Sequence, residues 1–147
     1  MKNPLIFLFA VILSVAVFSS CSKEDNNDAA TFSQNYIAQL NGVNAVPTNS
    51  SSATAMLNAV YSSNTQTFNF TITYSGMAPT SWAIHSGAKG VVGPIEFALG
   101  AITPSPYSGS IVLTAAQLSN LAAGLYYVNI VSGGFPGGEV RGQITKK

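Results

Sequence analysis

One run near the C-terminus decides the fold: Gly133-Gly134-Phe135-Pro136-Gly137-Gly138-Glu139-Val140-Arg141-Gly142-Gln143-Ile144. Four glycines and a proline in its first half exclude a helix interior and are unfavourable inside a strand, so we predict a shaped turn there. From Glu139 onward polar residues occupy odd positions, whereas Val140 and Ile144 occupy even ones. This period of two predicts a closing strand with one buried face.

Short strand patterns fill the chain before this run. The clearest is residues 67–74, where Phe68, Phe70 and Ile72 alternate with polar residues. A short polar turn joins it to the alternating residues 53–61, which predicts a β-hairpin. About eight short strands follow across residues 31–147, with at most one short helix at 115–123. We predict one all-β domain, a sandwich or a barrel, because a parallel α/β domain needs long helical runs between its strands.

Charge and cysteine content exclude several classes of function. Only 7% of the 147 residues are charged, and the net charge is +1. The Lys and Arg residues are scattered, which excludes the basic stripe of a nucleic-acid-binding protein. The single Cys excludes an internal disulfide and a cysteine-based zinc site, and the single His limits metal chemistry. We therefore expect no metal or other cofactor.

The N-terminal segment, residues 1–20, has the pattern of a targeting signal. Lys2 precedes an apolar run that continues to Phe18 and ends in small residues. This predicts a secretory signal rather than a membrane-spanning helix. Residues 18–21, Phe-Ser-Ser-Cys, resemble a relaxed bacterial lipobox, which implies that Cys21 becomes the first mature residue and carries lipid, including palmitate. The alternative is an ordinary signal peptide with a cysteine near its cleavage site.

Residues 21–30 form a polar tether. The acidic residues after Cys21 resemble the surface-export signal of lipoproteins in Bacteroidetes-type bacteria, and the alternative is a plain solvated linker. We therefore expect an outer membrane lipoprotein held to the membrane by lipid on Cys21. We expect it to be exposed on the cell surface, or otherwise to face the periplasm.

Three pieces of the domain at residues 31–147 resemble, in the same order, the chordin-domain (CHRD) family. The first is Tyr36-Ile37-Ala38-Gln39-Leu40-Asn41-Gly42 with Val46-Pro47 and Ala53-Thr54-Ala55; the second is Ala83-Ile84-His85-Ser86-Gly87 with Gly90, Gly93-Pro94-Ile95 and Leu99; the third is Leu125-Tyr126-Tyr127-Val128-Asn129-Ile130 with Pro136-Gly137-Gly138-Glu139-Val140-Arg141-Gly142-Gln143. The resemblance implies an immunoglobulin-like or superoxide-dismutase-like antiparallel β-sandwich. It implies an extracellular setting, as in chordin, which binds growth factors, and it assigns no activity.

One departure from the family bears on metal chemistry. The family often has a second histidine two residues before His85, on the same face of the strand, where a copper or zinc site would need it. Ala83 occupies that position here. The resemblance to copper-zinc dismutases therefore does not extend to their metal site.

Each remaining candidate residue has two interpretations. His85 is either a structural residue bonded to backbone in the loop 86–93, or a general base acting with Glu96 or Glu139. Glu139 and Arg141 lie on one side of the closing strand, and they form either a ligand-recognition pair or a framework pair. Five aromatic residues form either an exposed contact patch or core: Trp82, Tyr107, Tyr126, Tyr127 and Phe135.

We therefore expect a non-enzymatic binding or structural module that contacts extracellular protein or glycan. The alternative is an enzyme or metal protein that uses His85 with Glu96 or Glu139. The motif residues that are structural or ligand-contacting on this prediction are His85, Gly93, Pro94, Gly138, Glu139, Arg141 and Gly142.

Overall fold

The computed structural model describes residues 31–147. The expected signal segment, residues 1–20, and the whole polar tether, residues 21–30 with the expected lipid on Cys21, lie outside the described residues. Within residues 31–147 the chain forms nine strands, one α-helix and one 3-10 turn. Their order is β1 (Ser33–Asn41), η1 (Gly42–Asn44), β2 (Thr54–Ser62), β3 (Thr67–Ser75), β4 (Pro79–Ser86), β5 (Ile95–Ala98), β6 (Tyr107–Val112), α1 (Ala115–Ala122), β7 (Tyr126–Ser132), β8 (Phe135–Gln143) and β9 (Thr145–Lys146).

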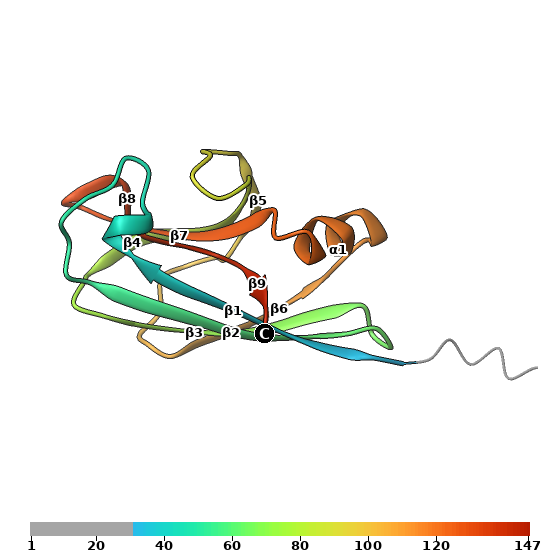
Figure 1. Cartoon of the computed structure of the whole chain (residues 1–147). Helices are drawn as coiled ribbons and strands as arrows, with labels where there is room; N and C mark the ends of the chain where they lie inside the picture. Colours follow the sequence, from blue (N-terminus) through green and yellow to red (C-terminus); the bar gives the residue numbers. More distant parts are fainter. Residues whose placement is uncertain (1–30) are drawn as a thin grey trace, which may run out of the picture.

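Eight of these strands lie side by side in one curled sheet. Their order is β5-β4-β7-β8-β1-β2-β3-β6, every neighbouring pair is antiparallel, and the short β9 pairs with β1. Figure 1 shows the curl as two layers, with β4, β5 and β7 above β1, β2, β3 and β6. The layers join where β8 pairs with β1, at Arg141 and Asn41. The predicted antiparallel β-sandwich with one short helix is thus confirmed.

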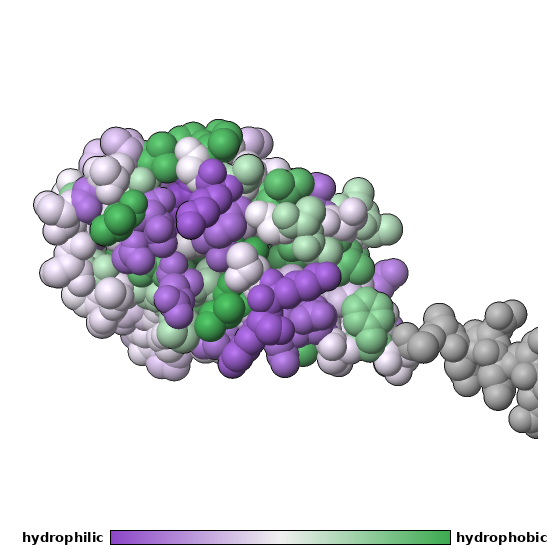
Figure 2. Space-filling view, in the orientation of Figure 1, coloured by the Kyte–Doolittle hydropathy of each residue, from purple (hydrophilic) through white to green (hydrophobic). Residues whose placement is uncertain are grey.

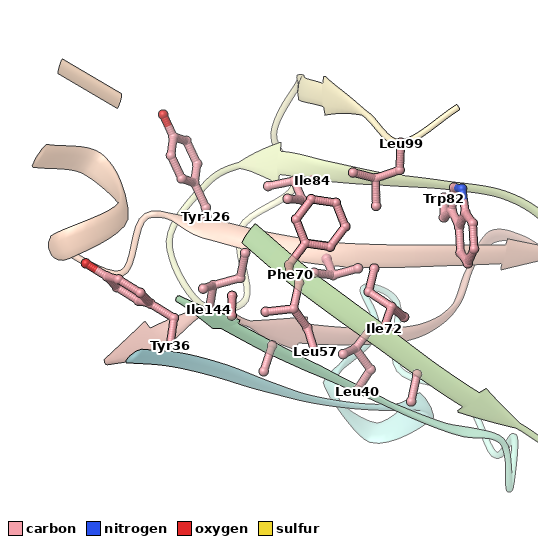
Figure 3. Close-up of a cluster of buried hydrophobic side chains, with 14 of the residues drawn as sticks. Tyr36, Leu40, Leu57, Phe70, Ile72, Trp82, Ile84, Leu99, Tyr126 and Ile144 are labelled. Carbon is pink, nitrogen blue, oxygen red and sulfur yellow. The ribbon is translucent and has the colours of Figure 1, made fainter. Parts of the chain in front are cut away.

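The core lies between the two layers and follows the period-two pattern of the strands. In β2 and β3 every second residue faces the core, and among these Leu57 and Ile72 are fully buried. The facing layer contributes Trp82 and Ile84 from β4 and Val128 from β7. Figure 3 shows side chains from both layers meeting in one cluster. Each large aliphatic side chain removed from water stabilises the fold by about 1.5–3 kcal/mol, so this alternation holds the layers together.

Helix α1 lies at one end of the sandwich (Figure 1). Thr114 caps it, as the sequence predicts, and Gln117 completes a capping box by bonding back to Thr114. Leu121 is buried against the core. Gly124 follows the helix with φ +69°, a left-handed conformation that glycine adopts without strain.

The closing strand starts earlier than the sequence predicts. Only Gly133 and Gly134 form the turn, and β8 already begins at Phe135, so the expected turn through residue 138 is wrong. The ladder between β7 and β8 is irregular here: from the pair Ser132–Phe135 to the pair Ile130–Val140, β7 contributes one residue and β8 contributes residues 136–139. A bulge accommodates proline and glycine, which weaken a regular strand, and this explains how these residues fit.

Candidate functional site

A loop, residues 86–94, covers the outer face of β4, β7 and β8, on the side away from the core; we call it the platform loop. Four side chains of this face hold it from below: His85, Tyr127, Arg141 and Gln143. His85 pairs with Tyr127 across the sheet, and Tyr127 pairs with Gln143. Arg141 lies two positions before Gln143, so it shares the same face. We call these four side chains the supporting cluster.

Tyr127 lies at the centre of the supporting cluster. Its ring stacks on the His85 ring with 5.1 Å between centroids and 13° between planes. The guanidinium carbon of Arg141 lies 3.5 Å from the centre of the same ring, within the range of a cation–π interaction. Tyr127 is only 2% exposed, so these contacts form away from water, where the attraction is stronger.

Arg141 connects the sheet to the middle of the platform loop. Its Nη2 donates hydrogen bonds to the carbonyl oxygens of Ala88, at 3.2 Å, and Val91, at 2.8 Å. Burial lowers the pKa of the guanidinium from its usual value, and Tyr127 opposes this shift. Arginine is not deprotonated in proteins, so the side chain stays charged, and its bonds to neutral carbonyls are charge-assisted.

Gln143 fastens the start of the loop. Its Nε2 donates to the carbonyl oxygen of Gly87 at 2.9 Å and to that of Gly124, after α1, at 2.7 Å. The amide of Gly87 donates to the carbonyl of Leu125 at 2.7 Å. The platform loop is therefore tied both to β8 and to the segment that follows the helix.

His85 and the Tyr127 hydroxyl fasten the end of the loop. His85 Nδ1 lies 3.0 Å from the carbonyl oxygen of Gly93, which only accepts, so Nδ1 carries a proton in this bond. The amide of Gly93 donates to the Tyr127 hydroxyl at 3.0 Å. The carbonyl of Pro94 accepts from the amide of Ser86 at 2.9 Å, which closes the loop at its base. A Cβ on Gly93 would collide with the Ser86 carbonyl oxygen, so this close approach needs glycine.

A second loop, between η1 and β2, covers the outer side of β8. Ser51 donates from Oγ to a carboxylate oxygen of Glu139 at 2.7 Å. Asn49 Nδ2 donates to the carbonyl oxygens of Gly138 and Glu139, at 3.2 and 3.1 Å. Gly138 has φ +127° and its Cα lies against the Asn129 side chain, so a larger residue would be strained and would collide there.

The two loops correct the expectation that β8 buries only one face. Glu139 and Arg141 are 6% and 3% exposed, although they point away from the sandwich core. The polar positions of the strand are buried because loops from elsewhere in the chain lie over them. Gly142, on the core side, approaches β1 so closely that an added Cβ would lie 2.5 Å from the Gln39 carbonyl oxygen.

The structure separates residues that the sequence suggested as partners. Arg141 bonds the platform loop and Glu139 bonds the second loop, so each serves a different contact. Glu96 accepts a hydrogen bond from Gln117 at 2.8 Å. His85 contacts Gly93 and Tyr127 rather than an acid. Within residues 31–147, no three His, Cys, Asp or Glu side chains gather as a metal-binding group.

The aromatic residues proposed from the sequence are divided between the core and the supporting cluster. Trp82 and Tyr126 belong to the core, and Tyr127 lies under the platform loop; all three are buried. Tyr107 packs against Trp82 with 4.6 Å between ring centroids, and Phe135 is half-buried at the tip of the β7–β8 hairpin. The interpretation of these residues as an exposed aromatic patch is wrong.

Sequence reasoning missed the role of several residues in holding the loops. Tyr127 and Gln143 could have been found, since strand alternation and hairpin pairing place both beside Arg141. Asn49 and Ser51 gave no signal, because they belong to a polar loop whose position over β8 depends on the whole fold. Their contacts join residues 88 or more positions apart.

The CHRD domain family model matches residues 36–144. The chain belongs to the CHRD-domain family. The matched region runs from β1 to the end of β8, so the CHRD domain comprises both layers, the platform loop and the residues that hold it. A search of curated proteins and a search of solved structures each returned no significant match. None of the helices in the described part of this CHRD protein has the length and apolar character needed to cross a membrane.

Proposed function

We propose that this CHRD protein is a lipid-anchored extracytoplasmic module that binds protein or glycan, or serves a structural role, at the cell surface, without enzymatic activity. One observation carries the non-enzymatic part. The polar side chains of the family motif are engaged with loop backbone: His85 with Gly93, Arg141 with Ala88 and Val91. Arg141 engaged in this way shapes a surface. His85 lies beside Gly93 and Tyr127, whereas the acids that it would need for proton transfer bond other residues, Glu96 with Gln117 and Glu139 with Ser51.

The outer face of the opposite layer supports a binding role. The strands β1, β2, β3 and β6 contain no charged residue, and their outward positions are mostly amides and hydroxyls. Two shallow hollows of about 410 and 560 Å³ lie on this face. Their outward-facing lining residues are Gln39, Asn41, Thr54, Met56, Thr73 and Ser75 in one, and Asn35, Asn58, Val60, Asn69, Thr71, Ser108 and Lys147 in the other. Lys147 is the one charged residue of this lining, and we call the strand residues themselves the uncharged face. Such a face suits a partner that offers mainly hydroxyl or amide groups.

The lipid anchor is supported by sequence. Cys21 is the only cysteine of the chain, and it directly follows an apolar segment that ends in two serines. A polar tether then leads to the domain. In this arrangement acyl chains on Cys21 hold the protein to the membrane while the CHRD domain stays in the aqueous phase.

Replacement of Cys21 by Ser tests the anchor. We expect the wild-type protein in the membrane fraction with incorporated palmitate, and Cys21→Ser in the soluble secreted fraction without it. Ser20→Ala is a neighbouring control that should keep both properties. Unchanged membrane retention of Cys21→Ser would contradict the anchor.

Two measurements test the non-enzymatic role. Asn58→Ala and Asn69→Ala change the uncharged face, and we expect them to reduce binding of the protein to intact cells or to a neutral-glycan array. His85→Asn, which changes the supporting cluster in the other layer, should leave that binding unchanged. Elemental analysis of the purified protein provides the counter-test, because stoichiometric copper or zinc would support the metal alternative.

A further inference from the structure

The platform loop and its surroundings present an apolar ridge to solvent. Four aliphatic side chains form it: Val91 and Val92 in the loop, Ile95 at the start of β5, and Leu125 before β7. They are 53%, 67%, 61% and 37% exposed. Ile95, which pairs with His85, directly follows the loop, and Leu125, whose carbonyl accepts from the Gly87 amide, lies beside its start. Figure 2 shows hydrophobic surface along the upper side of the domain, where the loop before β5 lies in Figure 1.

The ridge cannot easily withdraw its side chains from water. Arg141, Gln143, His85 and Tyr127 bond the backbone of the platform loop at its start, middle and end. The loop therefore keeps its shape while Val91 and Val92 point outward. Contiguous exposed apolar side chains on a fixed loop are typical of contact sites.

The platform loop carries one charged side chain, which is positive. Lys89 is the one charged residue in residues 86–95, and it is exposed beside Val91 and Val92. An apolar tip with an adjacent ammonium group matches the boundary of a phospholipid layer, where acyl chains meet anionic headgroups.

We propose that the apolar ridge inserts into a phospholipid surface and orients the domain on the membrane. This rests on the lipid anchor of the proposed function, which keeps the membrane within reach. The eleven residues between Cys21 and the start of β1 span at most about 40 Å when extended. A domain of this size has a radius of gyration of about 13 Å, so the tether lets any of its sides turn toward the membrane.

The narrowness of the ridge argues against a second copy of the chain as the occupant. A stable protein interface buries about 800 Å² on each partner and involves roughly 20–30 residues a side. The ridge offers four aliphatic side chains and one lysine. A fluid lipid surface needs no shape complementarity, so a narrow protruding ridge is sufficient there.

The proposed contact also fixes which face is available to other partners. The ridge belongs to the layer of β4, β5 and β7, and the uncharged face belongs to the opposite layer (Figure 1). With the ridge on the membrane, the outer face of β1, β2, β3 and β6 points away from it. The lipid contact would thus present the uncharged face to the extracytoplasmic space.

Vesicle flotation with the unlipidated Cys21→Ser chain tests the proposal without the anchor. Mass spectrometry first establishes that the apolar segment 1–20 has been removed. The chain is mixed with vesicles of phosphatidylethanolamine and phosphatidylglycerol at a ratio of three to one, and the floating fraction gives a partition coefficient. Val91→Asp/Val92→Asp tests the ridge. Val112→Asp is the matched control, since Val112 is 68% exposed on β6 in the opposite layer.

We expect the Val91→Asp/Val92→Asp chain to partition at least about tenfold less than the parent, because two aliphatic contacts are lost and two negative charges are added. Val112→Asp should partition like the parent. Lys89→Gln should weaken partitioning on these vesicles and have no effect on neutral phosphatidylcholine vesicles. No flotation of the parent, or an equal loss in Val112→Asp, would overturn the ridge proposal. The anchor would still be judged separately, by fractionation of Cys21→Ser in cells.

Discussion

Arg141 on β8 lies with its guanidinium carbon 3.5 Å from the centre of the Tyr127 ring on β7. The two residues are diagonal neighbours, because Tyr127 pairs with Gln143. Both are buried beneath a loop that follows a different strand, β4. The most distinctive segment of the sequence therefore acts on a distant loop and holds it over the sheet.

Replacement of Arg141 should loosen the platform loop. Arg141→Lys keeps the charge but loses the planar contact with Tyr127, and we expect a loss of about 1–2 kcal/mol in the free energy of unfolding. Arg141→Ala also leaves the Ala88 and Val91 carbonyls without their donor, and it should cost about 2–4 kcal/mol. Urea unfolding followed by the fluorescence of Trp82 measures both. Lys146→Ala, at an exposed position, is the control. If Arg141→Ala lost no more free energy of unfolding than Lys146→Ala, the role of the supporting cluster would be contradicted.

Gly93 is expected to be irreplaceable at the base of the platform loop. In Gly93→Ala the new methyl group would collide with the Ser86 carbonyl oxygen, so the backbone must shift. We expect about 2–4 kcal/mol of destabilisation and faster amide hydrogen exchange in residues 86–94. Gly133→Ala is the matched control, because a Cβ there meets no atom within 4 Å. Equal stability and equal exchange in the two variants would argue against this close approach.

The Tyr126 hydroxyl is expected to be dispensable. It is buried and makes no hydrogen bond in the described part of the chain, although Asn120 and Glu96 lie near it. Tyr126→Phe should therefore keep or raise the free energy of unfolding, by up to about 1 kcal/mol. Tyr74→Phe is the contrast, because its hydroxyl donates to the Thr103 carbonyl at 2.9 Å and its loss should cost about 1 kcal/mol. The reverse ranking in urea unfolding would show that the Tyr126 hydroxyl has a partner.

Alkaline pH should destabilise the domain through two buried tyrosines. Burial raises the pKa of Tyr36 and of Tyr126 above the ordinary value of 10.0. Ionisation is then harder in the folded state than in the unfolded state. Their contribution to stability is complete below pH 10 and is lost as the pH rises through the unfolded pKa and on through the folded one. Between pH 8 and 11 the free energy of unfolding should fall less steeply with pH for Tyr36→Phe and Tyr126→Phe than for the parent. Identical slopes would exclude this cause.

Asn49 should anchor the second loop to β8. Asn49→Ala removes two hydrogen bonds to the carbonyls of Gly138 and Glu139 and a third to the amide of Ser51. We expect a loss of about 2 kcal/mol in the free energy of unfolding. Asn64→Ala, in the exposed turn between β2 and β3, should change it by less than about 0.5 kcal/mol. A loss confined to that control value would mean that water replaces the Asn49 bonds.

Strand alternation was enough to predict most of the fold. Phe68, Phe70 and Ile72 on one strand and Leu57 on the next are buried as their spacing requires. Thr114 and Gly124 mark the start and end of the helix, because capping and left-handed backbone are local properties. The error at Pro136 and Gly138 has a local cause too: a bulge tolerates the residues that a regular strand excludes.

The sequence alone determined the sandwich, its helix and the family, because period-two patterns, caps and ordered motifs depend on neighbouring residues. It also set the lipobox resemblance at Cys21. Only the tertiary structure decided that Glu139 and Arg141 are buried and that each holds a different loop. The burial of a polar strand face depends on distant loops that cover it, and residues such as Asn49 and Ala88 reach β8 only when the whole sheet has curled. The closing segment is thus a strand because of its own period-two pattern, and it supports two loops because those loops fold over it.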